Sequence, residues 1–390
     1  MNSPRRLRKG EVAPQYVPKV RPAEQLMVDA LADVQGERIL CNSSGRAQFA
    51  FALAIAKPQS QVTCWFLDVH LRDQAALAPA GVPANLQLVC EPDFPGIEYQ
   101  TICLVLPKTG EAELTRDLLQ QACVRLVEGG TLIATTDMRD DQWLHTEIQR
   151  FFPKVTRRPT RKGVTYLAIK TESPKKLKNH DCEFMFRDGE RLIRMKSRPG
   201  VFAHRKLDVG ARTLISVIEP MEQGQIVDLG CGSGGVAVAA ALRHPELDVL
   251  AVDSNPRAIE CTQWAAKENG TSRVQTRLDA TGKSLESNSV DVVYANPPYF
   301  SNYKIAGIFI ETAFRILIPG GRIYIVTKAP AWYVESLPLL FENVTSDLIR
   351  GYSIVKATKS MSGKVPAPAP EYEEYRSAKP RRRKPKLYEE

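Results

Sequence analysis

The sequence predicts an α/β protein of two tandem domains, and three observations point to this class. An apolar run ends in a glycine-rich turn at 228–235, which reads Asp-Leu-Gly-Cys-Gly-Ser-Gly-Gly. Two further apolar runs end at Asp253 and at Asn296-Pro297-Pro298-Tyr299. The first half of the chain repeats the same order of runs. A first strand that ends in a glycine turn, followed by a second strand that ends in an acidic residue, is typical of Rossmann-like βαβ units.

The glycine turn and two acidic residues indicate a cofactor that contains adenosine. Glycine lets the backbone approach a ligand without a clash at Cβ. Asp253, at the tip of the run 249–252, can accept hydrogen bonds from both hydroxyls of a ribose. Asp279 follows the short run 274–278 and is placed to meet an adenine amino group. We expect cofactor contacts at Asp228, Gly230, Cys231, Gly232, Gly234, Asp253, Ser254, Asp279, Ala280 and Asn296.

The tetrapeptide Asn296-Pro297-Pro298-Tyr299 follows the apolar run 290–295 and carries the expected chemistry. An aryl or amide amine is a poor nucleophile because its lone pair is delocalised. The Asn296 side-chain oxygen and the Pro297 carbonyl can accept its two N–H groups and favour a pyramidal nitrogen. Tyr299 offers a ring on which a base can stack, which contributes roughly 1–3 kcal/mol. We expect all four residues to be catalytic, in a direct, in-line transfer.

Each of these signals has a plainer interpretation when it stands alone. A glycine turn also serves dinucleotide-dependent oxidoreductases, and Asn-Pro-Pro is a common way for a chain to leave a strand. The order and spacing of the signals, with Gly320-Gly321 ahead of another apolar run, favour a methyltransferase. Its predicted cofactor is S-adenosylmethionine, and its predicted acceptor is a planar exocyclic nitrogen. This chemistry requires no metal ion and no covalent intermediate.

Length and composition bound the class of protein. The 390 residues are enough for two or more domains with separate cores. No run of about 18 apolar residues exists, and no apolar segment follows the basic start, so neither a membrane span nor a secretory signal is expected. The eight cysteines are scattered and form no CxxC pair, which is typical of buried thiols rather than of a disulfide framework or a zinc site. We expect a cytoplasmic protein.

The formal net charge of +9 is concentrated in three segments. Residues 1–20 hold five Lys or Arg and one Glu. Residues 153–178 hold nine Lys or Arg and one Glu, and residues 361–390 hold eight Lys or Arg and five Glu. Such segments can reach a polyanion, although basic tails can also serve solubility alone. We expect the run 381–384 to contact nucleic acid. The Pro/Ala stretch 365–370 before it is expected to be an extended, disordered spacer.

The first half of the chain looks like a degraded copy of the second. The segment 36–45 matches the strand and turn that begin at Gly224, and Asp68 matches Asp253. On the same offset, residues 105–108 (Val-Leu-Pro-Lys) take the place of 296–299. The first copy has therefore lost its glycine turn and its asparagine. We expect it to keep the fold without the chemistry, either as a folding and docking partner or as a substrate-binding domain.

Two basic segments are candidates for substrate contact. The segment 151–170 reads as a closing pair of strands, and we favour contact at this edge. A hairpin is expected at 182–196 around Asp188-Gly189, then a helix from 207 to Glu219. Residues 187–206 carry seven Lys or Arg against two acids, which fits a solvated hairpin or a phosphate-contacting lip equally well.

These segments set the predicted domain boundaries. We expect a basic tail at 1–20, a degenerate methyltransferase-like domain at 21–172, a linker at 173–181, the catalytic domain at 182–360 and a disordered Pro-rich, basic tail at 361–390.

The segment Pro199-Gly200-Val201-Phe202, the stretch 207–210 (Leu-Asp-Val-Gly), the glycine turn and the NPPY tetrapeptide together resemble a known family. They are similar to the bacterial ribosomal RNA guanine-N2 methyltransferases, the small-subunit methyltransferase C and large-subunit methyltransferase G type. The resemblance spans roughly residues 30–358. NPPY alone is shared with adenine-N6 and protein glutamine-N5 methyltransferases, so the tandem pair and the 199–210 segment are the more specific features.

The resemblance implies two tandem class I S-adenosylmethionine-dependent methyltransferase domains, the first degenerate. Each has a seven-stranded, mostly parallel sheet with one antiparallel strand near its C-terminal edge. It implies that Phe202 and residues 207–210 roof the cofactor pocket, and that ribosomal RNA or a ribosomal subunit is the partner. The family usually has NPPF-His, whereas Phe300 follows NPPY here. Either Asn302 or Tyr303 replaces that His, or the base differs.

The resemblance leaves three functions open. The favoured one is methylation of the exocyclic N2 amine of a guanine in ribosomal RNA. The same chemistry on adenine-N6 or on a protein glutamine-N5 is the second. A non-catalytic RNA-binding or ribosome-assembly protein is the third, and the intact glycine turn, Asp253 and NPPY speak against it.

Overall fold

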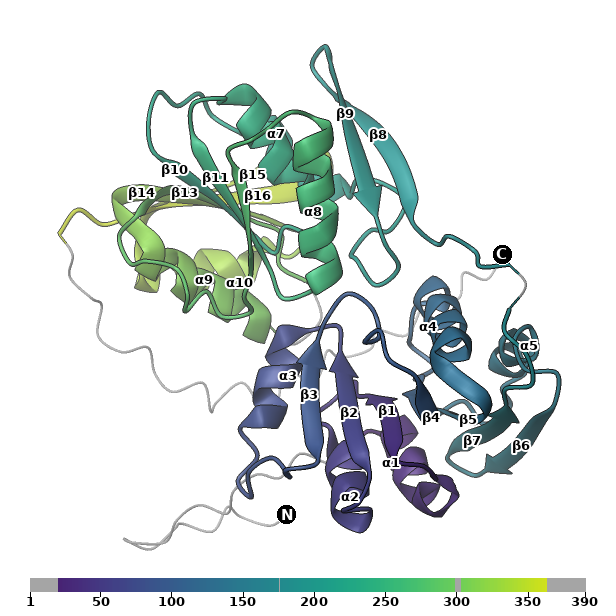
Figure 1. The fold of residues 1–390 in the computed structure, drawn as a ribbon. Helices are drawn as coiled ribbons and strands as arrows, with labels where there is room; N and C mark the ends of the chain where they lie inside the picture. The colour runs from purple at the N-terminus through teal and green to yellow at the C-terminus, as the bar shows by residue number, and fades with distance from the viewer. Residues whose placement is uncertain (1–19, 175, 299–302, 363–390) are drawn as a thin grey trace, which may run out of the picture.

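The computed structural model describes residues 20–174, 176–298 and 303–362, which form two α/β domains and a hairpin at the side of the second (Figure 1). Most of the two predicted tails, together with Tyr299 and Asn302, lies outside these residues. Each domain is a seven-stranded sheet with helices on both faces. The predicted class of two tandem Rossmann-like domains is therefore confirmed.

The first domain has the strand order β3-β2-β1-β4-β5-β7-β6. Its strands are β1 (Arg38–Asn42), β2 (Gln61–Phe66), β3 (Leu86–Cys90), β4 (Tyr99–Val105), β5 (Leu126–Thr136), β6 (Val155–Thr160) and β7 (Gly163–Ile169). Its helices are α1 (Pro22–Asp29), α2 (Gln48–Ala56), α3 (Val69–Ala76), α4 (Ala112–Arg125) and α5 (Trp143–Gln149), with a 3-10 turn at Leu31–Asp33.

The second domain repeats this order as β12-β11-β10-β13-β14-β16-β15. Its strands are β10 (Gln225–Leu229), β11 (Asp248–Asp253), β12 (Val274–Leu278), β13 (Val290–Ala295), β14 (Leu317–Thr327), β15 (Phe341–Ile349) and β16 (Tyr352–Lys359). Its helices are α6 (Val209–Ser216), α7 (Gly235–Arg243), α8 (Pro256–Glu268), α9 (Lys304–Ile316) and α10 (Pro330–Ser336), with a 3-10 turn at Leu337–Leu339. In each sheet one strand, β7 or β16, runs antiparallel to its neighbours, as the resemblance implied.

The alternation of side chains along the strands explains why both faces of each sheet are covered. In β10, Ile226 packs in the core on the side of α6 and α7, and Val227 packs in the core on the side of α9 and α10. Successive side chains of a strand point to opposite faces, so a continuous apolar run requires helices on both. The first domain shows the same division, with α1 and α2 on one face and α4 and α5 on the other.

Two local predictions were wrong in detail. Gly320 and Gly321 lie inside β14 rather than before it, where the pairing with β13 shifts register and Gly320 has a φ of 83°. A bulge of this kind needs the left-handed conformation that glycine adopts readily. The helix that was expected to reach Glu219 ends at Ser216. Pro220 disfavours a helical conformation at the residue before it and cannot donate a backbone hydrogen bond, so the helix ends early.

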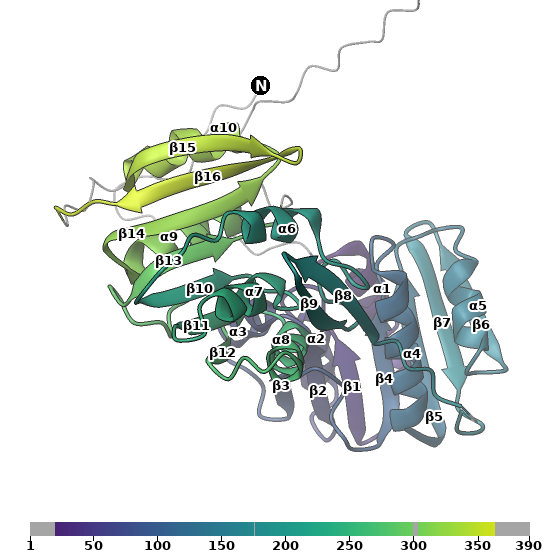
Figure 2. The same ribbon diagram turned by 90° about the horizontal axis from the view of Figure 1, so that it is seen from above.

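The predicted hairpin consists of β8 (Cys182–Asp188) and β9 (Arg191–Ser197). It packs against the second domain beside α7 and α8, as Figure 2 shows. Phe186, Ile193 and Met195 enter the core of that domain and are buried. The hairpin is therefore part of the second domain's core.

All eight cysteines have free thiols, and six of them are buried. No helix in the described ranges is both long and apolar enough to cross a bilayer. Among those residues there is also no group of three or more His, Cys, Asp or Glu side chains that could hold a metal ion.

The two domains meet at the ends of their parallel strands. Figure 1 shows β2 and β3 pointing toward the second domain. At the start of α3, which follows β2, the Val69 N–H donates to the Ser254 carbonyl at 2.9 Å. Ser254 directly follows β11. The Glu111 carboxylate accepts from the Gly200 N–H at 2.9 Å. The carboxyl edges of both sheets therefore face each other, and these are the edges at which α/β folds bind ligands.

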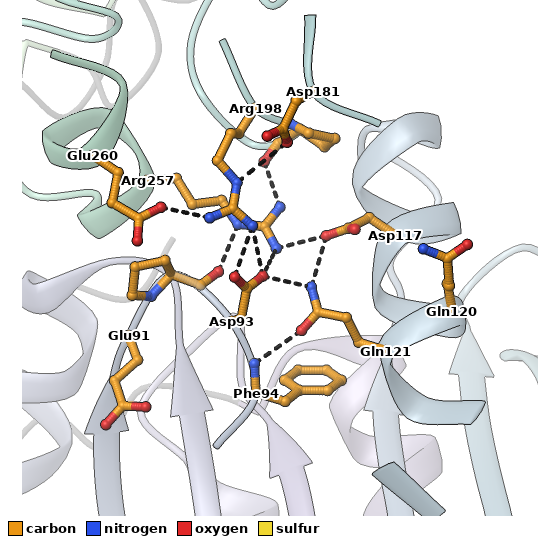
Figure 3. Close-up of polar contacts among 12 residues, drawn as sticks. Glu91, Asp93, Phe94, Asp117, Gln120, Gln121, Asp181, Arg198, Arg257 and Glu260 are labelled. Carbon is orange, nitrogen blue, oxygen red and sulfur yellow. Dashed lines mark hydrogen bonds and ion pairs between the residues drawn. The ribbon is translucent and has the colours of Figure 1, made fainter. Parts of the chain in front are cut away.

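A group of charged residues, here called the interdomain clamp, joins the two domains (Figure 3). It consists of Arg198 and Arg257 from the second domain with Asp93 and Asp117 from the first. Arg257 lies in the first turn of α8 and is fully buried. Its guanidinium donates to Asp117 at 2.6 Å and to Asp93 at 3.0 Å. It also donates to the carbonyls of Pro92 at 2.6 Å and Pro199 at 2.8 Å.

The clamp compensates its own buried charge. Burial raises the pKa of Asp93, but the neighbouring guanidinium groups of Arg198 and Arg257 outweigh this effect and hold the pKa below its usual value. Gln121 donates to both Asp93 and Asp117 at 2.8 Å and so fixes the two carboxylates. A buried guanidinium is tolerated only when its donors are paired in this way.

Asp117→Asn should lower the free energy of unfolding by about 1–3 kcal/mol, because a charged hydrogen bond to a buried guanidinium is lost. Chemical denaturation measures this. The matched control is Asp248→Asn, which removes a carboxylate from an ion pair with Arg273 in which both side chains are about half exposed. The control should change stability by less than about 1 kcal/mol. Equal effects in the two variants would contradict the importance of the clamp.

Candidate active site

A cavity of about 630 Å³ lies between the facing edges of the two domains. The second domain lines it with the ends of β10, β11 and β13, with the loop after β12 and with one face of α9. The first domain lines it with the ends of β1, β2 and β4 and with α4. The lining includes Asp68, Glu111, Leu114, Phe202, Gly230, Gly232, Asp253, Ser254, Asp279, Ala280, Asn296, Pro297, Pro298 and Phe309.

The glycine turn brings backbone, without side chains, to the wall of this cavity. Gly230 and Gly232 have φ values of 74° and 56°, in the left-handed region that favours glycine. A Cβ at Gly230 would stand 3.0 Å from the Phe309 ring. Gly232 has no neighbour within 4 Å of its Cβ position. A ligand can therefore lie directly against this backbone.

Asp253 stands beside the turn with both oxygens partly used. One oxygen accepts from the Gly232 N–H at 2.8 Å and the other from the Asn255 N–H at 2.9 Å. Each carboxylate oxygen can accept two hydrogen bonds, so one acceptor position per oxygen remains for a ligand. This arrangement suits the two neighbouring hydroxyls of a ribose, as the sequence predicted.

Asp279 lines the cavity and is bound by its own loop. One of its oxygens accepts from the Thr281 and Gly282 N–H groups, both at 2.8 Å, and the other accepts from the N–H and hydroxyl of Ser284. Its four acceptor positions are occupied by its own loop. Burial raises the pKa of Asp279, but these hydrogen bonds more than offset burial and lower it. Asp279 therefore shapes the loop that lines the cavity, and its contact with an adenine amino group stays a prediction.

Asn296 follows β13 and enters the cavity half-buried, next to the buried Pro297. Its side-chain Nδ2 donates to Asp208 Oδ2 at 3.0 Å. Within the described ranges, Asn296 Oδ1 makes no hydrogen bond of its own. Pro298 also lines the cavity, whereas the predicted catalytic Tyr299 belongs to the undescribed segment 299–302.

Three predicted cofactor residues do not line the cavity. Asp228 is buried under the turn and accepts from the Ala237 N–H at 3.1 Å, which ties β10 to α7. The Cys231 thiol lies 3.5 Å from the Thr262 hydroxyl. A Cβ at Gly234 would stand 2.7 Å from that same hydroxyl, so this glycine lets α8 pack closely. The side chains of Asp228 and Cys231 and the close packing at Gly234 support the turn from behind.

The roof implied by the 199–210 segment is only partly present. Phe202 lines the cavity and is 63% exposed. Leu207 instead packs on the second domain's core, where a Cβ at Gly235 would stand 2.7 Å from it. Asp208 reaches the site through Asn296.

The first domain's own version of the site is filled by protein. In the first sheet Cys41 of β1 pairs with Cys103, and in the second Asp228 of β10 pairs with Tyr294. Two residues after these partners come Val105 in the first domain and Asn296 in the second. Val105 therefore takes the position of Asn296. The Asn42 amide bonds the backbone of Val105. Ser43 Oγ accepts from the N–H groups of Gly45 and Ala47 and donates to the buried Glu24.

These contacts occupy the place of the glycine turn. Because the Val105 side chain has no hydrogen-bond acceptor, the first copy lacks both the turn and the acceptor of the second.

The cavity is apolar and acidic. Burial raises the pKa values of Asp68, Glu111 and Asp253. The described lining contains these carboxylates and no Lys or Arg. Such a site disfavours a pyrophosphate and suits a ligand with net positive charge, such as S-adenosylmethionine. The residues present therefore fit this cofactor better than a dinucleotide.

The contribution of the first domain and of α9 to this cavity was not predicted. Leu114, Ile308 and Phe309 are ordinary apolar helix residues in the sequence, and no local signal marks them. Only the docking of the two domains brings them to the site.

Several basic side chains near the hairpin form ion pairs, although Arg187, Arg191, Arg194, Arg205 and Lys206 are exposed. Four cations of the segment 187–206 pair with acids of α8, of the linker and of the first domain, and phosphate contact by this segment stays a prediction. The pairs are Arg194 with Glu268, Lys196 with Asp181, Arg198 with Asp93 and Glu260, and Arg205 with Glu113.

At the 151–170 edge, Arg158 pairs with Asp33 at 2.7 Å and the buried Lys170 donates to the Leu126 carbonyl. Within the described ranges, the side chains of Lys154, Arg161 and Lys162 pair with no other group, so these three remain available to a polyanion.

Comparison with known proteins identifies the fold and its relatives. Residues 192–356 match the family described as "Methyltransferase small domain". The chain is 28% identical over 318 residues to a protein of Streptomyces coelicolor named ribosomal RNA large subunit methyltransferase G, covering 75% of this chain and 81% of that protein. It is 31% identical over 154 residues to ribosomal RNA small subunit methyltransferase C of Klebsiella pneumoniae, covering 38% of this chain and 44% of that protein.

A solved structure matches across both domains. It is the T. Thermophilus 16S rRNA N2 methyltransferase RsmC in complex with AdoMet and guanosine, with a TM-score of 0.75 and 19% sequence identity. The match covers 87% of this chain and 92% of that one. The predicted resemblance, the tandem fold and the S-adenosylmethionine-dependent methyltransferase class are confirmed.

The stability of the turn should depend on pH through Asp228. Burial raises its pKa to about 7. A carboxyl with a raised pKa stabilises the fold while it is neutral, and this contribution is lost as the pH rises from about 4 through about 7. Asp228→Asn lacks this titration. Between pH 4.5 and pH 7.5 the variant should gain about 2–4 kcal/mol of unfolding free energy relative to the natural chain. Chemical denaturation at both pH values tests this, and a difference that does not change with pH would contradict it.

Proposed function

We propose that this methyltransferase transfers a methyl group from S-adenosylmethionine to the exocyclic N2 amine of a guanine in ribosomal RNA. The observation that carries the proposal is Asn296, which lines an acidic cavity beside the glycine turn and whose Oδ1 makes no hydrogen bond to the described residues. The similarity to ribosomal RNA methyltransferases G and C supports the choice of acceptor.

The second domain supplies the residues that would hold the cofactor. The backbone of Gly230 and Gly232 would receive its methionine part, and Asp253 would accept from its ribose hydroxyls. The loop shaped by Asp279, together with Phe309, would flank its adenine. When bound, S-adenosylmethionine supplies an electrophilic methyl group on a positively charged sulfur.

The residues after β13 would prepare the acceptor. Asn296 Oδ1 and the Pro297 carbonyl would each accept one N–H of the guanine amine. With both N–H bonds directed at acceptors, the nitrogen lone pair is less delocalised into the ring and can point at the methyl group. The fixed positions of these acceptors contribute by orientation and by electrostatics.

The facing domains would exclude water from this reaction. Leu114 and the other apolar side chains of the first domain cover the cavity opposite the glycine turn. A guanine must leave its base stack to enter, which costs a few kcal/mol in a duplex. An unpaired guanine, or one in an assembled subunit that exposes it, would therefore be the preferred target.

The proposal carries expectations about partners and location. We propose ribosomal RNA or a ribosomal subunit as the partner, with Lys154, Arg161, Lys162 and the basic tails as phosphate contacts. Such a substrate places the protein in the cytoplasm.

The proposal is tested with purified protein, isotope-labelled S-adenosylmethionine and ribosomal RNA from cells that lack the gene. Digestion to nucleosides and mass spectrometry should reveal labelled N2-methylguanosine. Labelled N6-methyladenosine, or label in a protein glutamine instead of RNA, would replace the proposed acceptor with one of its alternatives. No label in any acceptor would favour the non-catalytic function.

Asn296→Ala should lower turnover by at least about 100-fold, because an acceptor that acts in the transition state is lost. Its affinity for S-adenosylmethionine, measured by calorimetry, should stay within about threefold of the natural chain. Asn179→Ala, in the exposed segment between the domains, is the matched control and should keep full turnover. A large loss of cofactor affinity in Asn296→Ala would show that Asn296 serves the cofactor and not the acceptor.

Asp253→Ala should weaken S-adenosylmethionine binding by at least about 10-fold, because hydrogen bonds from the ribose to a carboxylate are lost. Asp248→Ala removes an exposed carboxylate at the other end of the same strand and serves as control. Calorimetry measures both. Unchanged affinity in Asp253→Ala would place the ribose elsewhere.

A further inference from the structure

We propose that Asp208 is a positioning residue for Asn296, which fixes the side-chain amide so that its oxygen faces the acceptor amine. This inference rests on the proposed function. Asp208 touches neither the cavity nor its ligands and would act only through Asn296.

The contact determines which way the amide points. Asn296 Nδ2 lies 3.0 Å from Asp208 Oδ2. A carboxylate accepts hydrogen bonds and cannot donate them, so the atom of Asn296 that faces it must be the NH₂ group. Assignment of the two amide atoms therefore follows from the chemistry of the partner. Asn296 Oδ1 then points away from Asp208, and it accepts no hydrogen bond from a residue in the described ranges.

Without this partner the amide would have two orientations. The terminal torsion of an asparagine is broad and roughly two-fold, so the oxygen and the nitrogen can exchange places at small cost. In the exchanged orientation the NH₂ group would face the amine of the guanine. Two donors would then oppose each other, and the amine would lose its acceptor.

The same carboxylate oxygen is held in place by the start of α6. Asp208 is the N-cap of this helix, and its Oδ2 accepts from the N–H groups of Gly210 at 2.8 Å and Ala211 at 3.2 Å. Side-chain oxygens at the N-cap are strongly fixed by such bonds. The helix start therefore anchors the atom that anchors Asn296.

Gly210 makes room for this arrangement. A Cβ at this position would stand 2.7 Å from Asp208 Oδ2 and 3.1 Å from Asn296 Oδ1. Any side chain would have to displace one of the two. Asp208, Gly210 and Asn296 thus form one unit, although 88 residues separate Asp208 from Asn296 in the chain.

The competing explanation is that Asp208 only caps α6, and two variants separate the roles. Asp208→Ser keeps a good N-cap, but its hydroxyl is shorter and can donate as well as accept, so it no longer dictates the amide's orientation. Asp208→Asn keeps both functions. Its oxygen must face the Gly210 N–H to cap the helix and therefore also faces Asn296 Nδ2.

The experiment measures kcat and KM on ribosomal RNA from cells lacking the gene, together with cofactor affinity and thermal unfolding. Asp208→Ser should lower kcat by at least about 30-fold, because a misplaced reacting group is costly. Its KM, cofactor affinity and unfolding temperature should stay close to those of the natural chain. Asp208→Asn should stay within about 5-fold in kcat, since a neutral hydrogen bond replaces a charged one.

The double variant Asp208→Ser with Asn296→Ala gives the sharpest result. If Asp208 acts only through Asn296, the double variant should be no slower than Asn296→Ala alone, within about threefold. A further loss of 30-fold in the double variant would overturn the proposal, as would an unchanged kcat in Asp208→Ser.

Gly210→Ala covers the case in which Asp208→Ser does not fold. Alanine favours the helix interior but intrudes on both Asp208 Oδ2 and Asn296 Oδ1, so kcat should fall. An unchanged kcat in Gly210→Ala would then overturn the proposal. Measuring the methylation activity of the natural chain separates the test of Asp208 from the test of the proposed function. If the natural chain methylates no guanine, the proposed function fails first, whereas an active natural chain with unaffected variants rejects the role of Asp208 alone.

Discussion

The fully buried guanidinium of Arg257 is the constraint on which the arrangement of the two domains depends. A buried cation must have all its donors paired, and its partners come from both domains: Asp93, Asp117 and the Pro92 carbonyl from the first, and the Pro199 carbonyl from the second. The two sheets are therefore held with their carboxyl edges facing each other. Arg257 also lies four residues after Asp253 and next to the loop that carries Phe202. The pairing that joins the domains thus fixes two segments of the cofactor site at the same time.

This arrangement explains how a duplicated domain can lose its own chemistry and remain part of the site. In the first copy, Asn42, Ser43 and Glu24 fill the place of the glycine turn with hydrogen bonds of their own. The surface that remains lines the same cavity as the intact turn, with apolar side chains such as Leu114 and with the carboxylates of Asp68 and Glu111. Of the two roles expected for this copy, docking is visible in the structure as the clamp and the shared cavity. A substrate contact at its 151–170 edge stays a prediction that rests on Lys154, Arg161 and Lys162.

The sequence was most informative where structure depends on near neighbours. The run 290–295 became β13 because an apolar stretch forms a buried strand, and the run 274–278 became β12, which has no buried side chain. It was least informative where structure depends on distant partners. The carboxylate oxygens of Asp279 are bound by its own loop, and Arg198 and Arg205, which follow the hairpin, meet acids of the first domain, so neither could be read from composition. Asp208 was expected only in a roof over the cofactor, because its contact with Asn296 exists only in the folded chain.

The central claim is that one cavity, walled by both domains, holds the cofactor at the glycine turn of the second. The most direct measurement is a crystal structure of the full chain with S-adenosylhomocysteine. The account predicts the ligand against Gly230, Gly232 and Asp253, with Leu114 of the first domain facing it and the clamp intact. A ligand at the Ser43–Gly45 turn of the first domain, or domains parted with Arg257 unpaired, would contradict it.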